Sequence, residues 1–362
     1  MAMSPRAYHA IDTTGLPAHR YTDRRTDDLA VTLAAPKSDV PIPPPAEGGW
    51  GYVPEWGWGN FPPGTPPAPE PEPPDQVVVF EDMFRDGKLD QSKWFTRYIY
   101  TGPDGPGTLD YLNDEWQRFR ETGNHVFDAG GLCLAALPPA APPPDTNGGN
   151  WYPSGMLRSK ELFDLASGDE FYFECNAKVP RGKGVWPAFW LAADAQIPND
   201  LLTVRWPPEI DIMEIVNNAG EDTTYMLGAR CQVLNWDTNP QKYSFTEVAE
   251  GYNGDFSVWY APFDFADDFH QFGLYYKRPN FTIYCDRSLI VSGVYDWVWD
   301  DGTPAPPAHI LCNLAIGGSW AGRYGVDDSA FPQALQVDYI RVYAKHAMTL
   351  PQGQIGRDYE VT

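Results

Sequence analysis

Three carboxylates lie within the apolar segment PPEIDIMEIV at residues 207–216: Glu209, Asp211 and Glu214. The other residues of this segment are mostly β-branched or apolar, a composition typical of a buried strand. Burying ionisable groups in such a strand costs free energy unless the groups are paired, and it is otherwise expected only where the groups have a function. Two carboxyl groups held about 5 to 5.5 Å apart can hydrolyse a glycosidic bond with retention, one as the nucleophile and the other as the acid/base. The segment therefore predicts a catalytic carboxylate pair of this kind.

The spacing of the three acids requires an irregular strand. Side chains alternate along a strand, so Glu209 and Asp211 share one face whereas Glu214 falls on the opposite face. A β-bulge near Ile212 and Met213 adds one residue and returns Glu214 to the first face. We therefore predict a bulge there and a single row of three carboxyl groups.

The alternative is a solvated acidic strand edge. The chain contains 49 Asp and Glu residues, so the pattern acid-x-acid-x-x-acid is expected about once by chance in a chain of this length. Chance does not supply the apolar residues around the acids. That surrounding sequence favours a buried row over a solvated edge.

The chain around this segment resembles glycoside hydrolase family 16, the β-jelly-roll endo-β-glycanases that include laminarinases, lichenases, agarases and bacterial exopolysaccharide depolymerases. The resemblance covers about residues 76–346 and follows the family's order. It is carried by VVFEDMFRDGKLDQSKW (78–94), SGMLRSKELF (154–163), KVPRGKGVWPAFWLA (178–192), DDFHQFGLYYKRPNFTIYCD (267–286), NLAIGGSWAG (313–322) and FPQALQVDYIRVYAK (331–345).

The resemblance assigns a role to each acid. It implies that Glu209 is the nucleophile, Glu214 the general acid/base, and Asp211 the residue between them that orients and tunes the pair. Like charges this close do not all ionise easily, so one carboxyl is kept protonated to serve as the acid. The order along the strand does not by itself distinguish the two glutamates. No cofactor is expected for catalysis.

Aromatic residues are the expected sugar platforms, because large rigid rings match the apolar faces of sugars. Trp186 and Trp190 share a face of the GVWPAFW strand. Trp186 is the stronger candidate for a platform. For Trp190, a platform role and a core-packing role are equally expected. The resemblance places Trp116 on the non-reducing side of the cleft and Trp320 on the other rim. Further candidates for hydroxyl contacts are Asn313, Arg158 and Glu115.

Two departures from the family pattern bear on substrate. The form WPPEID, with Pro207 and Pro208 before the first glutamate, resembles bacterial exopolysaccharide-degrading members. The segment YMLGARC at 225–231 replaces a His-containing strand, and its Arg230 could meet an acidic substituent. We predict an endo-acting retaining hydrolase of a β-1,3- or β-1,4-linked polysaccharide, a bacterial exopolysaccharide.

Two alternatives remain at this point. One is a laminarinase or lichenase that acts on plain β-glucan. The other is a carbohydrate-binding or virion structural protein without turnover, which has no need of a costly carboxylate row.

The resemblance also implies a structural calcium site on the convex face. The matching positions are Gly131 and Asp338, with the carbonyl of Met83 as a third ligand. Calcium takes six to eight oxygen ligands, and backbone carbonyls leave no side-chain signature. Asp338 could equally be a plain acid at a strand edge.

Composition narrows the class of partner. A net charge of −23 and a pI near 4.5 argue against nucleic acid, whose phosphates require clustered Lys and Arg. No apolar stretch approaches the length that spans a bilayer. The five scattered cysteines lack metal-ligand spacing and predict buried free thiols. His270 is expected to be a hydrogen-bonded structural residue, and no zinc site is expected.

Three regions follow from the distribution of residues. Residues 1–75 form a Pro-rich arm, residues 76–346 an all-β jelly-roll sandwich of short strands, and residues 347–362 a tail. The N-terminus lacks the apolar centre of a signal peptide, so we expect an extracellular enzyme that leaves by another route, or a protein of a phage particle. Trp50, Trp56 and Trp58 suggest that the arm docks onto this domain or onto a larger assembly, a phage particle or a secreted complex.

Overall fold

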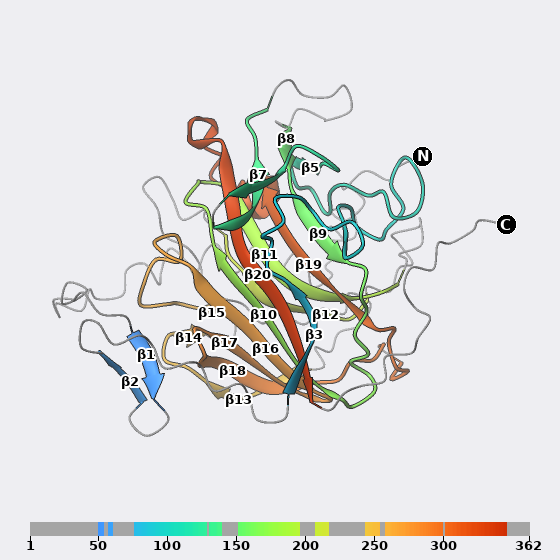
Figure 1. Cartoon of the computed structure of the whole chain (residues 1–362), viewed down its shortest axis with the longest axis vertical. Coiled ribbons are helices and arrows are strands. Elements are labelled where there is room, and N and C mark those ends of the chain that lie inside the picture. Colours follow the sequence, from blue (N-terminus) through green and yellow to red (C-terminus); the bar gives the residue numbers. More distant parts are fainter. Residues whose placement is uncertain are drawn as a thin grey trace.

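The computed structural model describes residues 50–53, 57–60, 76–128, 130–139, 151–195, 207–216, 243–253, 258–299 and 301–345. Nearly all regular structure in these ranges is β, in antiparallel sheets, which confirms the predicted jelly-roll class. Two large sheets dominate the fold (Figure 1). The one α-helix within the described ranges is α3, a single turn at Gly318–Ala321.

The larger sheet has nine strands. Their order is β13 (Tyr243–Val248), β18 (Ser288–Tyr295), β17 (Asn280–Cys285), β16 (His270–Lys277), β10 (Glu170–Lys178), β20 (Gln333–Lys345), β7 (Gly131–Ala136) and β6 (His125–Asp128), and β3 (Gln76–Asp82) also pairs with β20. The long strand β20 thus has two partners along one edge, β7 and β3.

The smaller sheet has five strands. Their order is β12 (Glu209–Glu214), β11 (Val185–Ala193), β19 (Ala308–Ile316), β9 (Met156–Ser159) and β4 (Trp94–Phe95). The acidic segment forms β12, at one end of this order among the described residues.

Three small strand pairs complete the described part of the chain. They are β1 (Trp50–Val53) with β2 (Gly57–Asn60), β5 (Gln117–Phe119) with β8 (Tyr152–Ser154), and β14 (Tyr252–Asn253) with β15 (Val258–Trp259). The hairpin β1–β2 lies within the Pro-rich arm and includes Trp50 and Trp58. Most of residues 1–75 and all of residues 347–362 lie outside the described residues.

The main core lies between the two large sheets. Strand β10 contributes every second side chain, Phe171, Phe173, Cys175 and Ala177, all fully buried as a two-residue period requires. Strand β19 is instead buried along its whole length. A second apolar cluster covers its other face, where Tyr98, Tyr100 and Phe119 pack over Trp190 and Leu311. The smaller sheet is therefore covered on both faces beside its acidic edge.

Four of the five cysteines can be placed. Cys133, Cys175, Cys285 and Cys312 are buried and free, which confirms the expected free thiols for these positions, and Cys231 lies outside the described residues. Within the described ranges, none of the helices is long and apolar enough to cross a membrane.

Candidate active site

The predicted bulge is present in β12. Ala192 pairs with Glu209 and Trp190 with Asp211, but the next pair of the ladder joins Phe189 to Met213. Ile212 is therefore the extra residue. Ala188 then pairs with Glu214, so all three acids lie opposite even-numbered residues of β11 and share one face of the sheet.

The row of acids is largely removed from solvent. Glu209, Asp211 and Glu214 are 7%, 5% and 9% exposed. On the other face of the strand Ile210, and at the bulge Ile212, are fully buried in the main core. Core packing on one face thus holds the backbone that presents the acids on the other.

Two tyrosines lie close to Glu209 and were missed by the sequence analysis. Burial raises the pKa of both Tyr98 and Tyr100 well above the ordinary value. The negative charges of Glu115 and, less strongly, Glu209 raise the pKa of Tyr98 further, and the charge of Glu209 raises that of Tyr100. Both phenols therefore stay protonated beside the first glutamate. The alternation TRYIYTG, with tyrosines two apart, was the one signal that could have identified them.

Trp186 contacts the second glutamate directly. Its indole Nε1 donates a hydrogen bond of 2.9 Å to Oε1 of Glu214. Trp320 packs edge-on against the Trp186 ring, with centroids 4.6 Å apart. Trp186 is half-buried, so it has surface left for a sugar while its N–H holds the carboxylate. The structure gives this predicted platform a second role in positioning Glu214.

Trp190 is engaged differently. It is 6% exposed and packs in the second apolar cluster against Tyr98. Its Nε1 donates a hydrogen bond of 2.7 Å to Oδ1 of Asn313, itself buried on the adjacent strand β19. Of the two roles considered for Trp190, packing is the one that this burial supports. The same bond engages Oδ1 of Asn313, a residue that is itself a candidate for contact with a sugar hydroxyl.

Trp116 and Trp320 come to the same end of β19. A Cβ added at Gly317 would lie 2.4 Å from the Trp116 ring, so that ring lies directly against the glycine. Trp320 follows three residues later in α3. Trp320 also contacts Trp186. That Trp116 and Trp320 lie on opposite sides of the substrate stays a prediction.

The remaining candidates for substrate contact lie on the loop and strands beside the row. Arg158 is buried, stacks on Phe95, and donates from Nε to the carbonyl of Arg97. Its register places it opposite Leu311, which in turn pairs with Trp190. Arg158 therefore lies on the same face as the acids, three strands from β12. Arg230 lies outside the described residues.

The carboxyl of Glu115 is held by hydrogen bonds within its own loop. Its Oε2 accepts hydrogen bonds from the backbone N–H of Leu112 and from the side-chain amide of Gln117. Burial raises the pKa of Glu115 to about 7, against the lowering effect of these two bonds. The carboxyl shapes the loop that carries Trp116 and is partly protonated near neutral pH.

This shift predicts a pH dependence of stability. The pKa of Glu115 is about 7 in the folded chain and 4.5 in its ordinary state, so its contribution is fully present below pH 4.5 and is lost as the pH rises through 7. The variant Glu115→Gln cannot titrate. Its melting temperature, relative to wild type, should therefore rise between pH 4.5 and pH 7. A difference that stays constant over this range would contradict the assignment.

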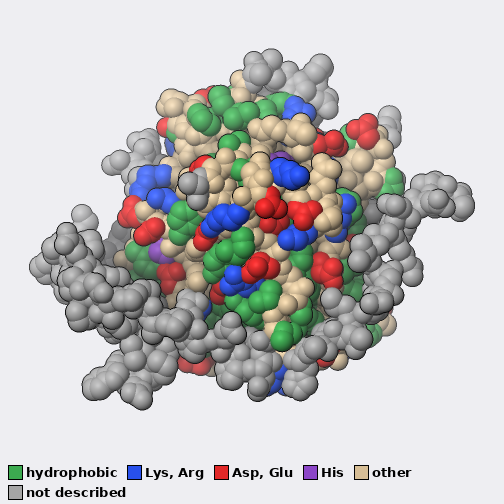
Figure 2. Space-filling view, viewed as in Figure 1, with side chains coloured by type: hydrophobic (Ala, Val, Ile, Leu, Met, Phe, Trp, Pro, Cys, Tyr) green, Lys and Arg blue, Asp and Glu red, His purple; other side chains and the backbone are tan. Residues whose placement is uncertain are grey.

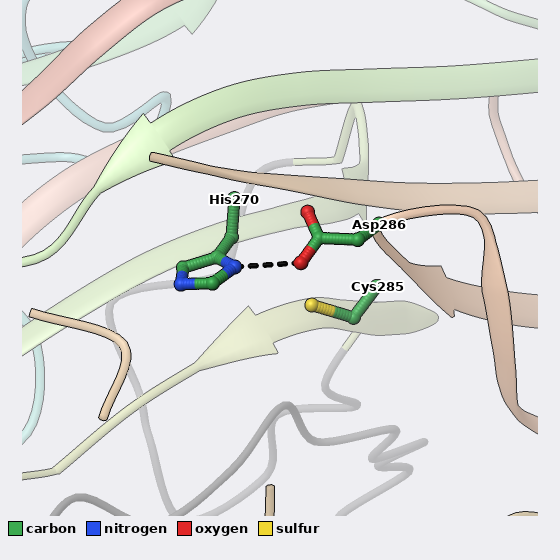
Figure 3. A group of neighbouring side chains, drawn as sticks. All are labelled: His270, Cys285 and Asp286. Atoms are coloured by element: carbon green, nitrogen blue, oxygen red, sulfur yellow. Dashed lines mark hydrogen bonds and ion pairs between the residues drawn. The ribbon is translucent and has the colours of Figure 1, made fainter. Parts of the chain in front are cut away.

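A separate group of metal-ligand types lies on the larger sheet: His270, Cys285 and Asp286 (Figure 3), whose ligand atoms lie within 4.8 Å of one another. Nδ1 of His270 lies 2.6 Å from Oδ2 of Asp286, and Oδ1 of Asp286 accepts from the backbone of Gln271. The ring of Phe263 stacks on His270. Burial raises the pKa of the Cys285 thiol, so it stays protonated. The group fixes the Asp286–Arg287 turn, which supports the structural role expected of His270.

The three residues expected to bind calcium do come together, but around a side chain. The carbonyl of Met83, the backbone at Gly131 and the carboxylate of Asp338 all lie against the guanidinium of Arg85. Oxygens that already accept from a guanidinium do not offer the six to eight open ligands that calcium takes. With Arg85 in place, these residues do not fit the ion.

The sequence is similar to a known family and to curated proteins. The sequence model of "Glycosyl hydrolases family 16" matches residues 150–341, more than half of the chain. Glucan endo-1,3-beta-glucosidase A1 of Niallia circulans is 27% identical over 307 residues, which cover 77% of this chain and 42% of that protein. A beta-glucanase of Rhodothermus marinus is 34% identical over 181 residues, which cover 47% of this chain and 56% of that protein. The chain thus spans about half the length of these curated relatives.

A solved structure shares the fold. The crystal structure of SCLam, a non-specific endo-beta-1,3(4)-glucanase, is 28% identical with a TM-score of 0.54. The match covers 76% of this chain and 93% of that one.

Proposed function

The chain belongs to glycosyl hydrolases family 16, and we propose that it is an endo-acting, retaining hydrolase of β-1,3- and β-1,4-linked glucans. The observation that carries the proposal is the bulge at Ile212, which sets Glu209, Asp211 and Glu214 on one face of β12. Relatives whose names describe β-1,3- and β-1,3(4)-glucanases support the substrate class.

The proposed reaction is a double displacement. Glu209 attacks the anomeric carbon while Glu214 gives its proton to the departing oxygen, so the glycosidic bond breaks as an ester to Glu209 forms. Glu214, now a carboxylate, takes a proton from water, and the resulting hydroxide oxygen displaces Glu209 with a second inversion. The Trp186 N–H holds one oxygen of Glu214 through both steps. Asp211 lies between the two glutamates in the row.

The natural substrate is the finer part of the proposal. We propose a bacterial exopolysaccharide with a β-1,3 or β-1,4 glucan-type backbone, on the support of the WPPEID form of the active-site segment. A reducing-end assay on laminarin, mixed-linkage glucan and bacterial exopolysaccharides separates this from action on plain β-glucan. A faster rate on an exopolysaccharide supports the proposal, and activity on laminarin or mixed-linkage glucan alone contradicts it. Binding to these polymers without release of reducing ends would instead indicate a non-catalytic protein.

We further propose that residues 1–75 attach an extracellular enzyme to a larger assembly and take no part in hydrolysis, since Pro-rich chain is a semi-rigid spacer. The support is that β3, whose Gln76 pairs with Lys345 of β20, is already a strand of the larger sheet. A chain that starts at Asp75 should therefore match the full chain in melting temperature and in turnover on soluble glucan.

A matched truncation controls this test. A chain that starts at Phe84 also lacks β3, which leaves residues 340–345 of β20 unpaired on that edge, and its melting temperature should be lower. Misfolding of the chain that starts at Asp75 would show that the arm is part of the catalytic unit.

A further inference from the structure

The strand β20 has a break in its pairing at Asp338. Along one edge, β7 pairs with β20 up to Val337 and β3 pairs with it from Ile340 onward. Along the other edge, the pairing with β10 passes over one residue of β20, because Asn176 pairs with Tyr339 and the next residue, Ala177, pairs with Val337. Asp338 is the extra residue of this bulge, so its backbone carbonyl is left out of the ladder.

Arg85 fills the break. Its Nη1 donates to the carbonyl of Met83 at 2.7 Å and to the carbonyl of Asp338 at 3.2 Å, and its Nη2 pairs with Oδ1 of Asp338. The other carboxylate oxygen of Asp338 accepts a hydrogen bond of 3.0 Å from the side-chain amide of Asn176. One guanidinium thus joins the end of β3 to the bulge of β20, and Asn176 fixes the same carboxylate from β10.

Gly131 closes the site on its remaining side. Its φ of 118° disfavours other residues, and an added Cβ would lie 2.4 Å from the carbonyl of Val337 and 3.0 Å from Nη1 of Arg85. The backbone of β7 therefore lies directly against the guanidinium. A divalent ion here would have to displace Arg85, because two cations cannot share the same carbonyls and carboxylate.

We infer that Arg85 is a built-in cation that takes the place of a structural calcium ion and ties β3 and β7 to the bulge of β20. Carboxylate and carbonyl oxygens can accept hydrogen bonds from a guanidinium, and the same kinds of oxygen can coordinate calcium. The surrounding face pairs charges in the same way: Figure 2 shows basic and acidic side chains side by side on it, and Arg341 pairs with Glu81 on these same two strands. The fold then needs no bound metal at this position. This inference does not depend on the proposed function.

Thermal unfolding with and without calcium tests the inference. The melting temperature of the wild-type chain should be the same in EDTA and in millimolar calcium chloride. Arg85→Ala should lower it by about 4 °C, because three hydrogen bonds at the junction are lost. Calcium should raise the melting temperature of Arg85→Ala, whose emptied site frees the oxygens of Met83 and Asp338. Arg85→Lys keeps a positive charge, so its melting temperature should lie between those of the wild type and Arg85→Ala.

Arg181→Ala is the matched control, because Arg181 has a similar exposure and pairs with Asp264 and Asp267 without bonding a backbone carbonyl at a strand junction. Arg181→Ala should lower the melting temperature much less than Arg85→Ala does. The inference is overturned if EDTA lowers or calcium raises the wild-type melting temperature, or if Arg85→Ala is no less stable than Arg181→Ala.

Discussion

Glu209→Gln and Glu214→Gln should each lower turnover on soluble β-glucan by roughly three orders of magnitude or more, because each removes one half of a double displacement. The melting temperature should stay close to that of the wild type, since the amide has the shape of the carboxyl and both side chains lie on the face of β12 away from the main core. The measurement is initial rate per folded molecule.

The matched control is Glu174→Gln. Glu174 is also buried, but it lies on β10 of the other sheet and accepts a hydrogen bond from Tyr339. This variant should keep its turnover. Near-normal activity of either Glu209→Gln or Glu214→Gln would remove the residue from the proposed mechanism.

Azide separates the roles of the two glutamates. In Glu209→Ala the face of the sugar used by the nucleophile is open, so azide attacks there and gives an α-glycosyl azide. In Glu214→Ala a substrate with a good leaving group still forms the ester to Glu209, and azide then displaces it to give a β-glycosyl azide. The reverse pattern would exchange the assignments of Glu209 and Glu214.

Trp186→Phe should lower kcat by about 10- to 100-fold, because the bond from its N–H to Glu214 is lost while an aromatic ring remains. Trp186→Ala also removes the stacking surface, so it should raise KM for long glucans in addition. Its melting temperature should fall little, since the side chain is half-buried at the edge of a small cluster. Full kinetics on a polymeric substrate separate the two effects.

Trp190→Phe controls for the loss of an indole N–H. Its bond goes to Asn313, and the ring packs in the second apolar cluster, so its main effect should be on melting temperature. If Trp186→Phe instead lost melting temperature and kept its kcat, Trp186 would be a core residue.

The row of acids could be predicted because a regular strand would place Glu214 on the buried face, opposite to Glu209 and Asp211. Three carboxylates in an apolar strand make sense only on one face, and their spacing allows this only with a bulge, which the register then shows at Ile212. The contact of Trp186 with Glu214 could not be predicted in the same way. It depends on the pairing of Ala188 with Glu214 across two strands, and the sequence alone does not set that register.

Arg85 shows a second limit of the sequence. Its partner Asp338 is 253 residues away, and two of its three bonds go to backbone carbonyls, which have no residue type to recognise. The three positions named by the resemblance lie around one site, while the arginine at its centre could not be recognised from the sequence. The contact of Trp116 with Gly317 is equally hidden in the sequence, because it depends on a close approach that only the folded chain reveals.

The anomeric form of the first product tests the central claim most directly. Proton NMR during the first minutes of β-1,3-glucan hydrolysis should show new reducing ends in the β form, which then convert slowly to the equilibrium mixture, because a retaining enzyme inverts the anomeric carbon twice. The α form as the first product would mean a single displacement by water, and would contradict the role of Glu209 as a nucleophile in this row of carboxylates.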